Sequence, residues 1–201
     1  MNVSYFILPQ DKQKKLINAG YKVFSQYPYR KSSMSFVADE AGISKSLLFY
    51  YFKNKKEYYL YLFNKAIDFL NDGKLKNDCS QTKDLFEMTE LEIERRLKLM
   101  HDYPCLFQFV AKAYYESEEA IKEEIEAKKI AFSQVNKEDL LALIDYERFK
   151  NPSDAKILVD ILIFLAEGCM RGKEDLGNAK IKEILPKFRD MMDSLKSHYY
   201  K

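Results

Sequence analysis

Hydrophobic residues recur along most of the chain at the spacing of helical faces. The first clear example covers residues 11–27 and ends at Pro28, because proline cannot continue the helical hydrogen-bond ladder. Its apolar face follows an i, i+4, i+7, i+8, i+11 rhythm and consists of Leu16, Gly20, Val23, Phe24 and Tyr27. The pattern therefore predicts an amphipathic helix over this segment.

A glycine separates the two short helical patterns that follow. Ser33 can cap the first of them, and Gly42 ends it because glycine adopts a positive φ without strain. Ser44 can then cap the second. The inner faces are formed by Met34, Val37, Ala38 and Ala41 in the first helix and by Ile43, Leu48 and Phe52 in the second. We expect two helices joined by a tight turn.

The remainder of the chain also has helical periodicity. Asn54, with Glu57 three positions later, marks the start of a fourth helix. Polar loops are expected at residues 73–82 and 172–177, and Pro186 is expected to kink the last helix. Further helices are expected over residues 86–101, 104–116, 117–132, 137–146, 153–171 and 178–198. The predicted fold is all-α, with about nine helices and no convincing strand.

Composition predicts a cytoplasmic globular protein. Cys79, Cys105 and Cys169 are odd in number and lack any CxxC spacing, which is typical of reduced thiols. Residues 1–8 lack the basic leader and long apolar segment of a secretory signal. The most apolar run, residues 157–166, is well short of the roughly 20 residues that a membrane span needs. We therefore expect no membrane partner.

Charge is distributed unevenly along the chain. The net charge is only +2 over 201 residues, which by itself indicates no partner. Residues 1–60, however, hold ten Lys or Arg against four Asp or Glu, a net charge of +6, and the remainder carries −4. A basic N-terminal part on an acidic body favours contact of that end with a polyanion.

Residues 33–52 carry the motif that is most informative about function. Two helices that cross at a steep angle need a small residue where their backbones approach, and Ala38 supplies it. Gly42 supplies the positive φ at the turn, and Ile43 follows as a hydrophobic plug. This combination predicts a helix-turn-helix.

Over residues 12–63 the chain resembles the DNA-binding domain of the TetR family of bacterial transcriptional repressors. Phe24 matches the Phe near the end of the family's first helix, and Ser33 matches its capping Thr or Ser. Residues 37–43 match the run Ile-Ala-x-x-Ala-Gly-Val, and residues 48–55 match Leu-Tyr-x-Tyr-Phe-x-x-Lys. The chain departs from the family in having Pro28 in place of Gly, Leu47 in place of a small or hydroxylated residue, and Phe49 in place of Tyr.

The resemblance implies that the third helix lies in the major groove of DNA. Lys45 is the candidate base reader, because an ammonium can bridge the two acceptors of a guanine edge. Ser44 and Ser46 can donate or accept hydrogen bonds beside it. The other candidate contacts are Leu47 and Phe49 to a thymine methyl group, Tyr50 and Tyr51 to phosphates, and Lys55 and Ser33 at helix starts that favour anions.

The resemblance also implies a DNA-binding domain at residues 1–56 and a helical effector-binding and dimerisation domain at residues 57–201. A cavity for a small-molecule effector is expected among the middle helices, with Met88, Phe109, Val110 and Tyr114 as candidate lining residues. The last two long helices carry more apolar surface than a monomer can cover, which predicts a homodimer and a palindromic operator. An effector would then release a repressor from DNA by changing the separation of the two reading helices.

Two alternatives remain open at this stage. The same fold could act as an activator or respond to a protein partner, or the chain could be an all-α enzyme or a lipid-binding module. His101 and His198 have no Cys, His or carboxylate at metal-ligand spacing, and the chain has no Gly-rich phosphate loop. The sequence therefore predicts no catalytic residue, no cofactor and no metal.

Overall fold

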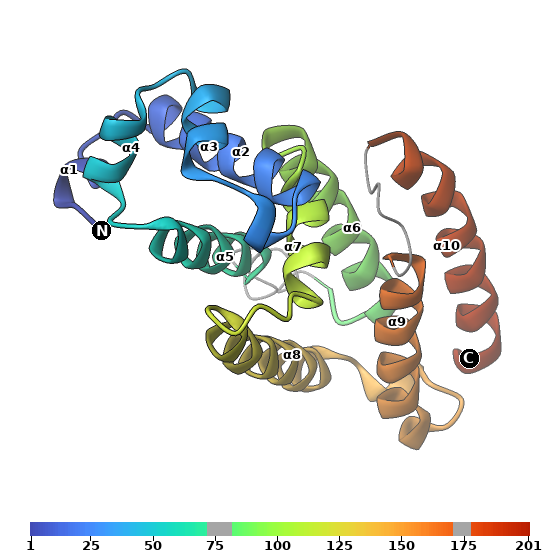
Figure 1. Ribbon diagram of the computed structural model, residues 1–201. Helices are drawn as coiled ribbons and strands as arrows, with labels where there is room; N and C mark the ends of the chain where they lie inside the picture. The colour runs from blue at the N-terminus through green and yellow to red at the C-terminus, as the bar shows by residue number, and fades with distance from the viewer. Residues whose placement is uncertain (72–81, 171–177) are drawn as a thin grey trace. The chain divides into compact units, whose positions relative to one another are not determined.

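The computed structural model describes residues 1–71, 82–170 and 178–201. This part of the chain is helical and contains no strand, as predicted (Figure 1). The predicted loops at residues 73–81 and 172–177, together with Cys79, lie outside the described residues. The α-helices are α1 (Val3–Phe6), α2 (Gln10–Gln26), α3 (Met34–Ala41), α4 (Lys45–Tyr51), α5 (Lys55–Asn71), α6 (Leu85–Asp102), α7 (Leu106–Tyr114), α8 (Lys122–Leu143), α9 (Ala155–Met170) and α10 (Asn178–Tyr199).

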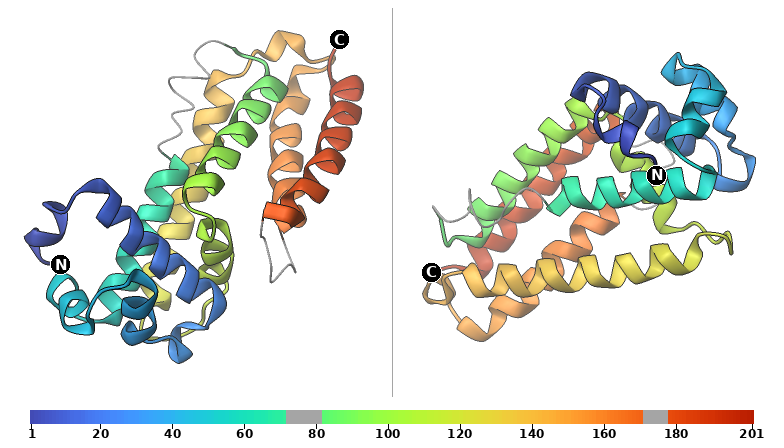
Figure 2. Two further views of the ribbon diagram at one scale, coloured as in Figure 1. Left: turned by 90° about the horizontal axis from the view of Figure 1, so that it is seen from above. Right: turned by 90° about the vertical axis from the view of Figure 1, so that its left-hand side faces the viewer.

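The chain divides into two compact units, each of which is formed by two separate segments. The N-terminal unit consists of residues 1–70 and 99–130, and the C-terminal unit consists of residues 71–98 and 131–201. Figure 2 shows the first four helices gathered in the N-terminal unit. The N-terminal unit thus contains more than the helix-turn-helix, because most of α5 and all of α7 belong to it. The predicted division after residue 56 concerns function and stays a prediction.

Aromatic rings form the core of the N-terminal unit. Phe24 of α2 meets Tyr59 of α5 edge-on, with ring centroids 4.8 Å apart. Phe109 of α7 joins them, at 5.2 Å from Tyr59 and 5.1 Å from Tyr21. All four rings are buried, and edge-on and tilted ring contacts add to the free energy gained by burial. This cluster holds α2, α5 and α7 together.

Two tyrosine hydroxyls join α2 to α5 inside this core. The Tyr58 hydroxyl donates to the Leu16 carbonyl at 2.7 Å, and the Tyr21 hydroxyl donates to the Leu62 carbonyl at 3.2 Å. Burial raises the pKa of both hydroxyls well above the ordinary tyrosine value. The two helices approach closely at Gly20, where there is no room for a side chain.

A buried carboxylate organises the C-terminal unit. Asp84 caps α6 by accepting hydrogen bonds from the backbone N–H groups of Phe86 and Glu87 at 2.8 and 3.2 Å. Its second oxygen accepts a hydrogen bond from Arg148 Nη1 at 2.7 Å. The Tyr200 hydroxyl lies 3.4 Å from Asp84 and accepts from the Leu85 N–H at 3.1 Å. The carboxylate therefore links the start of α6 to the end of α10.

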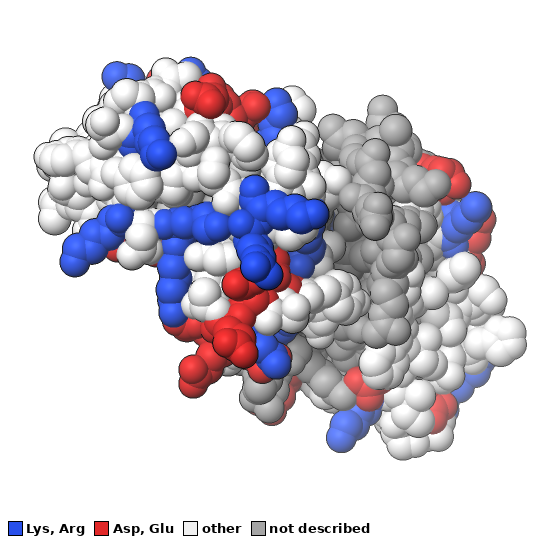
Figure 3. Space-filling model, in the orientation of Figure 1, with Lys and Arg blue, Asp and Glu red and all other residues white. Residues whose placement is uncertain are grey.

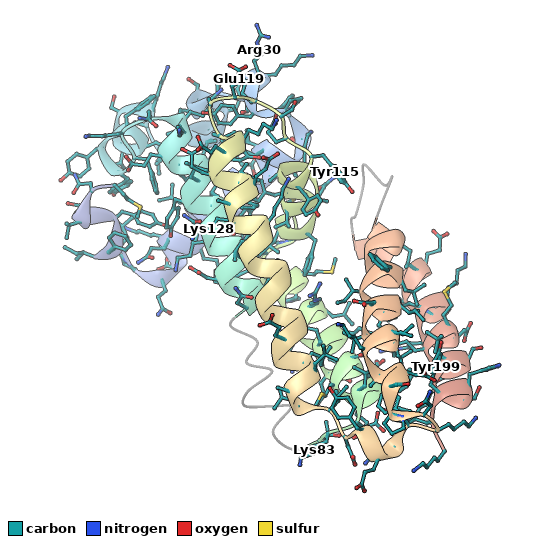
Figure 4. The ribbon with its side chains drawn as sticks, turned by 90° about the horizontal axis from the view of Figure 1, so that it is seen from below. Arg30, Lys83, Tyr115, Glu119, Lys128 and Tyr199 are labelled. Carbon is teal, nitrogen blue, oxygen red and sulfur yellow. The ribbon has the colours of Figure 1, made fainter. Side chains whose placement is uncertain are left out.

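Backbone contacts reinforce this end of the C-terminal unit. The Asp145 N–H donates to the Lys83 carbonyl at 2.9 Å, and the Lys150 N–H donates to the Tyr199 carbonyl at 2.8 Å. Lys83 and Tyr199 are labelled in Figure 4. The apolar core beneath them is formed by Leu85, Phe86, Met88, Ile144, Phe149, Ala155, Leu158, Val159, Leu162, Phe188, Met192 and Tyr200.

The start of α8 differs from the prediction. The two segments expected over residues 117–132 and 137–146 form one helix, and Ser117 does not cap it. The reason is Glu116, whose carboxylate accepts hydrogen bonds from the N–H groups of Ser117 and Glu118 at 3.1 and 3.2 Å and holds the chain in a turn ahead of the helix.

The last helix, α10, runs through Pro186 as one element. No described helix is long and apolar enough to cross a membrane.

Replacing Gly20 by Ala should destabilise the N-terminal unit. A Cβ at this position would overlap Leu62 Cδ1 and lie 2.5 Å from the Tyr58 hydroxyl oxygen, and neither buried side chain has space to move away. We expect the free energy of unfolding to fall by about 1–3 kcal/mol, the usual cost of overpacking, when measured by urea denaturation.

Asn64→Ala is the control for this substitution. Asn64 is an exposed residue of α5, the helix that Gly20 approaches, so a smaller side chain there causes no overlap. Alanine favours helix over asparagine, so this variant should match or exceed the wild-type stability by up to about 1 kcal/mol. Equal destabilisation by both variants would contradict the close crossing of α2 and α5.

Candidate nucleic-acid interface

The turn between α3 and α4 is formed by the residues that the sequence predicted for it. Gly42 has a left-handed backbone with φ of 64°, and its N–H donates to the Asp39 carbonyl at 3.1 Å. The Ile43 N–H donates to the Ala38 carbonyl at 3.0 Å. On the far side, the Ser44 hydroxyl accepts the Leu47 N–H at 3.1 Å and caps α4. Two separate helices at an angle are the result.

Both helices bury their inner faces as predicted. Val37, Ala38, Ala41 and Leu48 are fully buried, and Ile43 is half-buried between the helices. At the start of α3 the Ser33 hydroxyl accepts the Phe36 N–H at 3.2 Å. The packing of these small and branched residues leaves the opposite face of α4 without a covering element in the N-terminal unit.

The outward face of α4 carries five exposed side chains of mixed chemistry. They are Lys45, Ser46, Leu47, Phe49 and Tyr50. The Lys45 ammonium lies over the Phe49 ring, 5.9 Å from its centroid, because residues four apart share a helix face. Of the two aromatic side chains on this face, Tyr50 is the more exposed, at 55%. This surface can donate hydrogen bonds and contact a methyl group side by side.

Tyr51 is a correction to the predicted set of phosphate contacts. Its side chain is only 8% exposed and meets the buried ring of Tyr5 with centroids 6.0 Å apart. The next residue along the helix, Phe52, is fully buried against Tyr5 as well, at 4.9 Å. Tyr51 therefore belongs to the core of the N-terminal unit and not to the outward face of α4.

Lys55 is held by the protein itself. Its ammonium donates to the carbonyls of Tyr29 and Ser32 at 2.8 and 3.0 Å and lies 4.3 Å from the centroid of the Tyr29 ring. Desolvation lowers its pKa from the ordinary lysine value. These contacts join the start of α5 to the 3₁₀ turn at Tyr29–Lys31. Its main role in the structure is this clamp, which the sequence-based assignment to a phosphate contact did not include.

Other basic residues of the N-terminal unit divide into paired and unpaired groups. Lys14, Lys22 and Lys56 form ion pairs with Asp102, Glu40 and Glu124. Figure 3 shows Lys and Arg side chains over the start of α5, with Asp and Glu side chains below them at the start of α8. Arg30 points outward from the unit (Figure 4). Within residues 1–60, the exposed basic side chains with no ion pair among the described residues are Lys12, Lys15, Arg30, Lys31, Lys45 and Lys53.

The four predicted effector contacts are not brought together within one unit. Met88 is buried in the core of the C-terminal unit, whereas Phe109 is buried in the core of the N-terminal unit. Val110 is half-buried, and Tyr114 is 48% exposed at the end of α7. This set stays a prediction. In the described part of the chain, no group of three or more His, Cys, Asp or Glu side chains is arranged to hold a metal ion.

The structure adds a short N-terminal helix to the interface, which the sequence analysis missed. Asn2 caps α1 by accepting the Ser4 N–H at 3.0 Å, and the Asn2 N–H donates to the Tyr51 carbonyl at 2.9 Å. The signal in the sequence is Asn2 directly before a short apolar run, but four residues are too few to show helical periodicity.

Comparisons with known proteins agree with this architecture. Residues 16–62 match the family described as bacterial regulatory proteins, tetR family. The HTH-type transcriptional activator FasR of Mycolicibacterium smegmatis is 36% identical over 67 residues, which span 33% of this chain and 31% of that relative. A TetR family transcriptional regulator from Chloroflexus aurantiacus is 20% identical, with a TM-score of 0.59 over 100% of this chain and 98% of that one. MexZ, a repressor of Pseudomonas aeruginosa, is 18% identical, with a TM-score of 0.61 over 93% and 96%.

The fold and the matched segment define a helix-turn-helix protein with a helical C-terminal part. The matched segment contains α3, α4 and the turn between them, so residues 16–62 are similar to the DNA-binding part of TetR-type regulators.

Replacing Lys55 by Ala should destabilise the N-terminal unit. The buried Ser32 carbonyl would lose its ammonium donor and the Tyr29 carbonyl would keep only the Ser32 hydroxyl, so we expect the free energy of unfolding to fall by about 1–3 kcal/mol in urea denaturation. Lys56→Ala is the control, because Lys56 forms an exposed ion pair with Glu124 that contributes about 0–1 kcal/mol. A Lys55→Ala variant as stable as Lys56→Ala would show that the clamp contributes nothing.

Proposed function

We propose that this chain is a sequence-specific DNA-binding regulator of transcription that binds a palindromic operator as a homodimer in the cytoplasm. The observation that carries the proposal is the outward face of α4, which is exposed on a helix set at an angle by the Gly42 turn. TetR-type regulators are a DNA-binding family and not an enzyme family, which argues against the all-α enzyme considered from the sequence.

The chemistry of α4 suits the major groove. The Lys45 ammonium can donate to the O6 and N7 acceptors of guanine, and Leu47 and Phe49 can contact a thymine methyl group. Ser44 and Ser46 lie at the exposed start of the same helix and can hydrogen-bond to bases or phosphates. Tyr50 and the helix start at Ser33 are proposed to contact phosphates, which would fix the orientation of α4 in the groove.

An exposed apolar stripe on α9 supports the homodimer. Ile157 is 55% exposed and Phe164 is 69% exposed, and seven positions separate them, so that they share one helix face with Ile161. Met191 on α10 is exposed as well. Apolar side chains of this size are covered in a two-fold interface by the same helices of a second copy.

Repression with release by a small-molecule effector is our first proposal for regulation, and activation is the second. The similar proteins include a repressor, MexZ, and an activator, FasR, so they support both forms of regulation. The link to α7 favours control from the helical body. Lys112 of α7 donates to the carbonyls of Ser25 and Gln26 at the end of α2, and Glu116 accepts the Tyr29 N–H at 3.1 Å. A shift of α7 would therefore reach the segment that leads into α3.

Lys45→Ala should relax the sequence preference at one base pair of each half-site. The loss of a bidentate guanine contact costs about 1–3 kcal/mol of binding free energy. The probe is double-stranded DNA selected from a random library by the wild-type protein, and binding is measured by fluorescence anisotropy over a series of salt concentrations. Wild-type binding should weaken steeply with salt, because several Lys and Arg displace counterions from phosphates.

Lys98→Ala is the matched control for this experiment, because Lys98 is an exposed lysine on α6, outside the N-terminal unit and outside the helices of the proposed dimer interface. It should bind the selected DNA like the wild type. Wild-type protein that selects no sequence from the library would refute the proposed function, and equal binding by both lysine variants would refute the contact of Lys45.

Phe164→Glu should convert the homodimer to monomers in sedimentation velocity, because a charge placed in an apolar interface has no partner there. The control is Tyr115→Glu, which changes an exposed aromatic residue of similar size in the N-terminal unit and should leave the dimer intact. A dimer that survives Phe164→Glu would place the interface elsewhere.

A further inference from the structure

The N-terminal helix α1 packs against the end of α4 opposite the Gly42 turn. Tyr5 is fully buried, and its ring contacts Phe52 and Tyr61 at centroid distances of 4.9 and 5.2 Å. The hydroxyls of Tyr5 and Tyr61 lie 2.8 Å apart, and one donates a hydrogen bond to the other. With the Asn2 N–H bound to the Tyr51 carbonyl, α1 is anchored to both α4 and α5.

This anchor brings a polar side chain of α1 to the outward face of α4. Ser4 Oγ lies 3.0 Å from the hydroxyl oxygen of Tyr50, although 46 residues separate them in the chain. Tyr50 also stacks at a tilt on Tyr51, with centroids 5.7 Å apart, and Tyr51 is fixed in the core. One side of the Tyr50 ring and its hydroxyl are therefore both restrained, while the side chain stays 55% exposed.

We propose that Ser4 is a positioning residue for DNA binding, which holds the Tyr50 hydroxyl so that it donates to a phosphate of the operator. The inference rests on the proposed function and adds to it a residue outside the helix-turn-helix. Phosphate oxygens only accept hydrogen bonds, so a Tyr50 hydroxyl bound to phosphate must use its own proton there. Its oxygen then accepts from Ser4, and the two hydrogen bonds run in one direction, from Ser4 to Tyr50 to phosphate.

The benefit of this arrangement is preorganisation. An exposed tyrosine side chain loses rotational freedom when it binds, and that loss opposes association. A tyrosine already held by Ser4 and Tyr51 loses less. Because Ser4 carries no charge, the effect should appear in affinity and leave the slope of affinity against salt unchanged.

A double-mutant cycle on the selected operator DNA tests the proposal. Ser4→Ala and Tyr50→Phe should each weaken binding by roughly three- to tenfold, the range for one lost hydrogen bond. The double variant should bind no more weakly than Tyr50→Phe alone, because Ser4 acts only through that hydroxyl. Ser4→Thr keeps a hydroxyl and should restore binding to near the wild-type level.

Stability measurements separate positioning from folding. The pair is exposed, so the melting temperature should be the same for Ser4→Ala and for the control Ser197→Ala, a serine on α10 whose hydroxyl donates to a backbone carbonyl. Ser197→Ala should also leave DNA binding unchanged.

Three results would overturn the inference. They are wild-type binding by Ser4→Ala, a Ser4→Ala effect that persists in the Tyr50→Phe background, and a Ser4→Ala defect that tracks a loss of melting temperature. If the wild type binds the operator and Lys45→Ala weakens that binding while the cycle shows no coupling, the proposed function stands and only the role of Ser4 fails. A wild type that binds no DNA refutes both.

Discussion

The left-handed backbone at Gly42 is the constraint on which the proposed DNA-reading surface depends. Its φ of 64° lets the last carbonyls of α3 be satisfied and turns the chain at once into the cap of α4. Without that turn α3 would run on, and the residues from Ser44 to Tyr50 would not share an exposed face. The half-buried Ile43 then fills the angle between the helices and keeps it open.

Contacts from outside the motif hold this surface in place. Lys55 binds carbonyls of the segment before α3, and Lys112 caps the end of α2 from α7. Tyr5 holds the opposite end of α4 from α1. In each case a side chain that is distant in sequence binds the segment that leads into α3 or covers the end of α4, which are helices of only 8 and 7 residues. Short helices have little stability of their own, so such contacts decide how firmly they are oriented.

Local signals in the sequence were enough to predict the helix-turn-helix, and long-range packing accounts for most of what they missed. Helix caps depend on neighbouring residues, which is why the sequence predicts the capping roles of Ser33 and Ser44 that the structure confirms. Tyr50 and Tyr51, by contrast, are adjacent and chemically identical, but Tyr51 is three residues after the buried Leu48 and shares its inner face, where it meets the buried ring of Tyr5.

Hydrophobic periodicity could not predict where α8 starts. The start depends on the side chain of Glu116, which holds the preceding residues in a turn, and in a segment with many charged residues nothing in the sequence marks that glutamate as different from the others. The assignment of base and phosphate contacts from sequence stays a prediction, because in the proposed homodimer these contacts also depend on how the two copies are spaced. The predicted effector-binding residues also stay a prediction, since Met88 belongs to one compact unit and the other three belong to the other.

The tyrosines of the N-terminal unit give the protein an optical signal of its own alkaline unfolding. The chain has 15 Tyr and no Trp, so its near-ultraviolet absorbance comes mainly from phenol rings. Burial raises the pKa of Tyr21 and Tyr58, whose hydroxyls donate to carbonyls that a phenolate could not bind. Their neutral forms therefore stabilise the fold fully below about pH 10, and this stability declines as the pH rises above that value. Phenolate absorbance from these two rings would mark the separation of α2 from α5.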